Sequence, residues 1–63
     1  MLKDEQIKRG KKFKGLINNC LIEILELKKE LNNKLYVSCK DIKTNKTYKI
    51  SYETFKRLLL EEV

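Results

Sequence analysis

The 63-residue sequence contains no histidine, no proline and no tryptophan, and it has only two glycines and two cysteines. Histidine is the side chain used most often for acid–base catalysis near neutral pH, so its absence argues against that chemistry. Two cysteines without histidine are too few for a tetrahedral zinc site. We therefore expect a non-enzymatic protein without a metal ion or cofactor, in which Cys20 and Cys39 stay reduced as small apolar side chains.

Long apolar runs are also missing from the sequence. No stretch approaches the roughly 20 apolar residues that a membrane-spanning helix requires. The first five residues, MLKDE, are not followed by the apolar run of a signal peptide. These absences predict a protein that acts in the cytoplasm, without a membrane partner.

The balance of charge is positive, because 15 lysine and arginine residues face 9 acidic residues, a net charge of +6. A basic surface favours acidic partners, although lysine also keeps small domains soluble and protects the edges of sheets. A chain of this length buries only about 60% of its unfolded surface, so formation of a homodimer would be one way to bury more. We divide the chain into a flexible N-terminal arm, residues 1–9, and one domain, residues 10–63.

The most informative stretch is residues 35–60. Apolar and polar residues alternate over 35–40 and again over 47–52, which is typical of half-buried strands. Asn45 lies in the intervening turn, where a residue in the left-handed conformation would close a hairpin. Ile42 breaks the alternation, so we expect a shift of register near it.

A short helix is predicted after the hairpin. Ser51 is a suitable N-cap, and Phe55, Leu58 and Leu59 have the spacing of one apolar helical stripe. The acidic residues 61–62 oppose the helix dipole, so we expect the last turn to fray.

Residues 16–31 allow two interpretations. A helix would present an apolar stripe formed by Ile17, Cys20, Ile24, Leu27 and Leu31. A strand would place Cys20, Ile22 and Ile24 on one face, with Leu21, Leu25 and Leu27 on the other. Periodicity alone favours the helix, which gives an α+β fold with helix 16–31 packed on hairpin 35–52 and a C-terminal helix.

A resemblance favours the strand. The segments GKKF, CLIEILEL and NNKLYVSCKDIKTNKTYKISYETFKRLL occur in this order over residues 10–60. The order resembles small open reading frames of low-GC bacteria and their phages, which are similar to SH3-like barrels. Their pattern usually has glycine where this chain has Asn45, and residues 29–31 lengthen a loop. The resemblance implies a mainly β fold: a small SH3-like barrel or curled antiparallel sheet with a short C-terminal helix.

The same resemblance implies a function. It suggests a phage-type accessory protein that inhibits host nucleic-acid-handling or defence machinery by stoichiometric binding, as an anti-CRISPR or other anti-defence protein does. Its partner would be a host protein or nucleoprotein complex in a bacterial cytoplasm. The positive charge supports an alternative, a sequence-nonspecific module that binds DNA or RNA directly.

Candidate contact residues are the exposed lysines near the N-terminus and on the hairpin, together with one aromatic residue among them. Tyr36 alternates in step with Lys40, so its ring is expected outside the core, where it could stack on a base or a partner side chain. The predicted contacts are Lys8, Arg9, Lys11, Lys12, Lys14, Tyr36, Lys40, Lys43, Lys46 and Lys49. The carboxylates Glu23, Glu26 and Glu30 are expected at the solvated surface.

Overall fold

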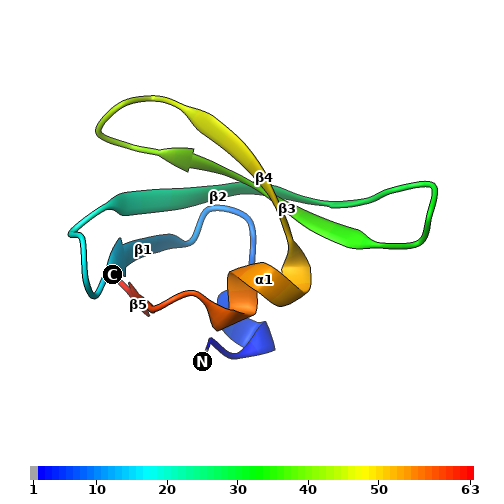
Figure 1. The fold of residues 1–63 in the computed structure, drawn as a ribbon, viewed down its shortest axis with the longest axis horizontal. Coiled ribbons are helices and arrows are strands. Elements are labelled where there is room, and N and C mark those ends of the chain that lie inside the picture. Colours follow the sequence, from blue (N-terminus) through cyan, green and yellow to red (C-terminus); the bar gives the residue numbers. More distant parts are fainter. Residues whose placement is uncertain (1) are drawn as a thin grey trace.

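The computed structural model describes residues 2–63 and contains a curled, unclosed antiparallel sheet of five strands (Figure 1). The sheet has the order β4-β3-β2-β1-β5. The elements are η1 (Asp4–Gln6, a 3-10 helix), β1 (Lys12–Gly15), β2 (Leu21–Lys29), β3 (Leu35–Asp41), β4 (Thr47–Ser51), α1 (Tyr52–Arg57) and β5 (Leu60–Glu62). The predicted mainly β fold, a curled antiparallel sheet with a short C-terminal helix, is confirmed.

The alternative with a helix over residues 16–31 is wrong. Ile17, which a helical stripe would bury, is 79% exposed in the loop before β2, whereas Ile24 is fully buried. The pairing of β2 with β3 shifts between Ile24 and Glu26, so that Leu25 is an extra residue in a β-bulge. Because of this bulge, Ile24 and Leu27 lie on the same face three residues apart, which imitates the spacing of a helix.

The bulge also corrects two details of the strand interpretation. Leu27 pairs with Val37 on the core side of the sheet, and not on the face opposite Ile24. The register shift that we expected near Ile42 lies in β2 instead. Ile42 follows β3, and its N–H donates to the carbonyl oxygen of Leu21 at 2.8 Å.

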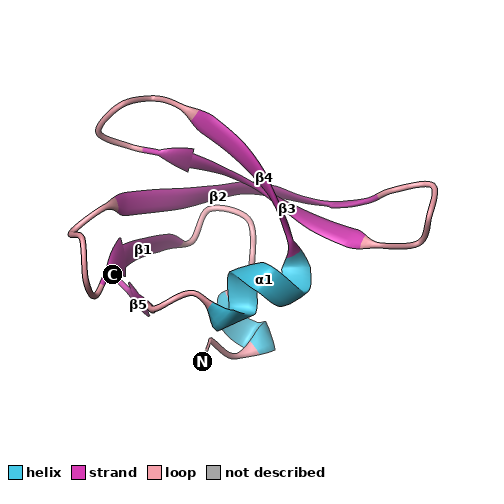
Figure 2. Ribbon diagram, in the orientation of Figure 1, coloured by secondary structure: helices cyan, strands magenta, loops and turns pink. Residues whose placement is uncertain are grey.

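The core lies between the concave side of the sheet and the two helical segments, which Figure 2 places on the same side. Phe13 of β1 and Phe55 of α1 meet edge to face, with ring centroids 5.7 Å apart. Ile24, Val37 and Cys39 line the sheet side of this contact and are fully buried. Burial raises the pKa of the Cys39 thiol, in keeping with its expected role as an apolar core residue.

Residues 2–9 contribute to this core through Leu2 and Ile7, which are 5% and 1% exposed. The segment is tied to α1 by Asp4, which accepts from the Tyr52 hydroxyl at 2.6 Å and pairs with Lys56 at 3.0 Å. Asp4 thereby raises the pKa of Tyr52 to about 12. The division of the chain into a flexible arm and a domain at residue 9 stays a prediction.

The hairpin between β3 and β4 has the predicted turn. Asn45 has a φ angle of 63°, in the left-handed region. The carboxylate of Asp41 accepts from the backbone N–H groups of Lys43 and Thr44, at 2.9 and 3.3 Å. These bonds stabilise the turn locally and leave its lysines at the tip.

The C-terminal segment differs from the prediction. Ser51 caps α1 by accepting from the N–H of Thr54 at 3.3 Å, as expected, but α1 ends at Arg57. The following residues form β5, which pairs with β1 and is not a frayed helical turn. Leu59 therefore lies outside the helix and is 58% exposed. Within residues 2–63, no helix has the length and apolar character needed to cross a membrane.

Candidate partner-binding surface

The outer face of the sheet combines predicted contact residues with carboxylates. The registers align Lys12 of β1, Glu23 of β2 and Lys40 of β3 in one row across the sheet. In the same way, Lys14 of β1 lies opposite Glu61 of β5. Opposite charges side by side on a sheet attract each other and reduce the local potential. The lysines of this face therefore form no continuous positive track.

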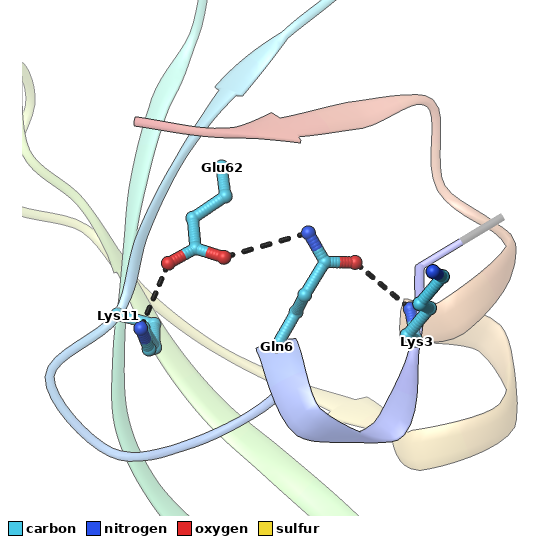
Figure 3. Close-up of polar contacts among 4 residues, drawn as sticks. All are labelled: Lys3, Gln6, Lys11 and Glu62. Carbon is cyan, nitrogen blue, oxygen red and sulfur yellow. Dashed lines mark hydrogen bonds and ion pairs between the residues drawn. The ribbon is translucent and has the colours of Figure 1, made fainter.

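Lys11 is also engaged by a carboxylate. Its ammonium group lies 2.8 Å from Glu62 of β5, and the Gln6 side chain donates to the same carboxylate at 3.4 Å (Figure 3). Gln6 in turn accepts from the backbone N–H of Lys3 at 2.9 Å. The bond to Lys11 lowers the pKa of Glu62. This contact joins the start of β1 to the C-terminal strand, so Lys11 has a structural partner within the chain.

Lys8 and Arg9 lie in the turn that precedes β1, and both are exposed. They are close in sequence to Lys12, also exposed, but the hairpin lysines lie on other strands and turns of the sheet. Figure 1 places the segment before β1 and the turn between β3 and β4 in different parts of the molecule. The N-terminal lysines and the hairpin lysines are therefore two separate groups.

The structure brings Tyr36 and Lys49 together. Tyr36 of β3 is half-buried on the outer face, and the ammonium group of Lys49 lies 4.8 Å from its ring centroid. This is within the range of a cation–π contact. Lys28 of β2 is the register partner of Tyr36, a neighbour that our candidate set did not include. Because the pairing of strands decides this neighbour, only the bulged register of β2 could have revealed it.

Lys49 also forms an ion pair with Glu30, in the loop after β2. The bond lowers the pKa of Glu30 and raises that of Lys49. Glu30 is thus at the surface as expected, but it is paired. The ring of Tyr36, this ion pair and the side chains of Leu31 and Asn32 surround one depression of the surface. Leu31 is fully exposed there.

The turn between β3 and β4 holds Lys43 and Lys46, which are both exposed. Lys43 donates from its ammonium group to the carbonyl oxygen of Asn19, 3.2 Å away in the loop between β1 and β2. That contact brings the two loops together at one end of the sheet. Lys43 and Lys46 in this turn and Lys49 in β4 all lie along the edge strand of the sheet.

Apolar side chains at the surface form a feature that the sequence interpretation missed. Ile17, Leu59 and Tyr48 are 79%, 58% and 47% exposed. The first two border a groove between the loop before β2 and the segment after α1. The sequence pattern places Ile17 and Leu59 in helical stripes, whereas the structure has both side chains exposed in segments that are not helical.

Among residues 2–63, no cluster of three or more cysteine, histidine or acidic side chains has the arrangement of a metal site. Cys20 and Cys39 are both free thiols, and Cys20 is half-buried. The chain matches no family model, no curated protein and no solved structure. The resemblance to small phage and bacterial reading frames therefore stays a prediction.

Proposed function

We propose that this chain is a non-enzymatic binding domain that acts by stoichiometric association with a protein or nucleoprotein complex. The observation that carries the proposal is the way charge and aromatic surface are arranged. Lys11 and Lys49 are held by carboxylates of the chain itself, and Lys12 and Lys40 flank Glu23. A backbone of phosphates is best met by a continuous positive track, which this arrangement interrupts.

The half-buried ring of Tyr36 supports a protein partner. It lies beside exposed Leu31 and under Lys49, so a partner would meet aromatic, apolar and charged groups within one patch. Interfaces between proteins are enriched in tyrosine, and a few such residues contribute most of the binding energy. The host setting, in the cytoplasm of a bacterium and against nucleic-acid-handling or defence machinery such as CRISPR effectors, rests on the resemblance alone.

Direct binding of DNA or RNA is the second candidate. It is favoured by Lys28 and Lys49 on either side of the Tyr36 ring, where a base could stack while the two ammonium groups contact phosphate. The positions of Glu62 beside Lys11 and of Glu23 between Lys12 and Lys40 weigh against it, because these carboxylates interrupt the positive track that a phosphate backbone would follow. We therefore rank it second.

Replacement of Tyr36 tests the proposal. We expect Tyr36→Ala to lower the affinity for the captured partner by roughly 30-fold. This corresponds to about 2 kcal/mol, the level of a binding hot spot. Tyr36→Phe keeps the ring and is expected to stay within about threefold of the native chain. The partner is first captured from the lysate of a low-GC bacterium on the immobilised chain, with nuclease present, and its affinity is then measured with purified components.

Two results would count against the proposal. If nuclease abolishes all capture, the partner is nucleic acid or is held only through it. If Tyr36→Ala binds as tightly as the native chain while circular dichroism shows an unchanged fold, Tyr36 is outside the interface.

A further inference from the structure

The open edge of β4 is a second surface with binding groups. β4 lies at the end of the strand order, so within residues 2–63 no strand pairs with its outer side (Figure 1). The N–H of Asp41 donates to the carbonyl oxygen of Lys46 at 2.8 Å. In an antiparallel pair, successive residues turn their N–H and C=O groups alternately toward and away from the partner strand, so this bond fixes which residues of β4 face β3. By this alternation, the N–H and C=O groups of Tyr48 and Ile50 face β3, while those of Thr47 and Lys49 face outward.

The side chains of β4 form two different faces along this edge. Tyr48 and Ile50 pair with Cys39 and Val37, so they lie on the core side, yet Tyr48 is 47% exposed. Thr47 and Lys49 lie on the outer face. A strand added to the edge would find apolar neighbours on its inner side and polar neighbours on its outer side.

The charged side chains that β4 and its flanking residues contribute are of one sign. From residue 42 to residue 52 the sequence contains three lysines, Lys43, Lys46 and Lys49, and no carboxylate. Two copies of this strand laid side by side would bring their lysines together, and like charges on facing positions destabilise a pair of strands. A second copy of the chain is thus a poor occupant, whereas an acidic strand complements the edge.

We propose that the β4 edge binds an extended segment of a partner protein in which acidic and apolar residues alternate. The segment adds a sixth strand to the sheet through the outward N–H and C=O groups of Thr47 and Lys49. Its apolar side chains cover Tyr48 and Ile50, and its carboxylates lie on the outer face near Lys49. The inference rests on the proposed function, because it names the chemistry of the protein partner.

The ion pair between Lys49 and Glu30 gives the proposal a specific consequence. Exposed ion pairs of this kind contribute little to stability, so a carboxylate of the partner can replace Glu30. Removing the charge of Glu30 leaves Lys49 available. Glu30→Gln is therefore expected to strengthen binding of an acidic strand, whereas Lys49→Glu weakens it.

The test uses an eight-residue peptide in which glutamate and valine alternate, titrated into the isotope-labelled chain and followed by amide NMR shifts. We expect the largest shifts at residues 47–51, slower exchange of the Thr47 and Lys49 amides, and contacts between peptide valines and Tyr48. Affinity should fall at least tenfold in Lys49→Glu and rise about twofold or more in Glu30→Gln. A peptide that alternates lysine and valine is the matched control and should not bind.

Several outcomes would overturn the inference. Shifts centred on the other open edge, β5, equal binding of the lysine peptide, or weaker binding in Glu30→Gln would each do so. Self-association of the free chain through β4, measured by sedimentation, would assign the edge to a second copy. If nuclease-resistant capture still depends on Tyr36 but the β4 edge does not respond, the inference fails and the proposed function stands.

Discussion

Ile24→Ala is expected to destabilise the protein by about 2–5 kcal/mol, the usual cost of removing most of a large aliphatic side chain from a core. Ile24 is fully buried in the middle of β2, against Cys39 of β3. A domain of this length has roughly 3–9 kcal/mol of stability in total, so the substitution should remove a large fraction of it. Urea denaturation followed by circular dichroism measures the difference.

Ile17→Ala is the matched control, because it removes the same atoms from a position that is 79% exposed. We expect it to change the free energy of unfolding by no more than about 0.5 kcal/mol. The two substitutions distinguish the strand from the helix, since a helical stripe over residues 16–31 would bury both isoleucines. Similar losses in both variants would contradict the strand.

Phe55→Ala is expected to lower the free energy of unfolding by about 3–5 kcal/mol, a large fraction of the total. Phe55 is the buried residue of α1 and packs edge to face on Phe13, so its removal opens a cavity between the helix and β1. Phe55→Leu fills part of that space and should recover part of the loss. Thermal unfolding is a convenient measurement, because each 1 kcal/mol shifts the midpoint by roughly 4–8 °C in a domain of this size.

Leu59→Ala provides the control for this prediction. A helix that continued past Arg57 would place Leu59 on the same stripe as Phe55, whereas the structure has it 58% exposed between α1 and β5. We expect a change of about 0.5 kcal/mol or less. A loss comparable to that of Phe55→Ala would mean that the C-terminal segment is helical and that β5 does not form.

The sequence predicts the parts of the fold that depend on local patterns. Alternation locates β3 and β4, and side-chain chemistry locates the left-handed turn at Asn45 and the cap at Ser51. The bulge at Leu25 is not a local signal, because it is defined by pairing with β3. The bulge gives the apolar residues of β2 the spacing of an amphipathic helix. Only the resemblance favoured the strand.

β5 was not predicted from the sequence for a related reason. Its three residues, Leu60 to Glu62, have little preference for a strand, and two of them are glutamates. They form a strand because β1 offers an edge, where Lys14 faces Glu61 and Lys11 contacts Glu62. Tertiary pairing thus overrides a weak local preference.

For the candidate contact residues too, exposure could be predicted from the local sequence, whereas their partners in the fold could not. Exposure of the hairpin lysines and the half-exposed ring of Tyr36 follow from alternation alone. The carboxylates that hold Lys11 and Lys49 are 51 and 19 residues away in the sequence, so charge counting could not reveal these pairs. Net charge therefore overstates the positive surface that is available to a partner.

The dependence of the captured complex on salt tests the proposed function most directly. The affinity of the purified, nuclease-treated partner is measured between 50 and 200 mM NaCl. We expect it to change by less than about tenfold, because binding depends on Tyr36, on apolar contacts and on few charges. A loss of roughly 10³–10⁵ over this range, as for a protein that neutralises 6–10 phosphates, would contradict an interface that depends on Tyr36, apolar contacts and few charges.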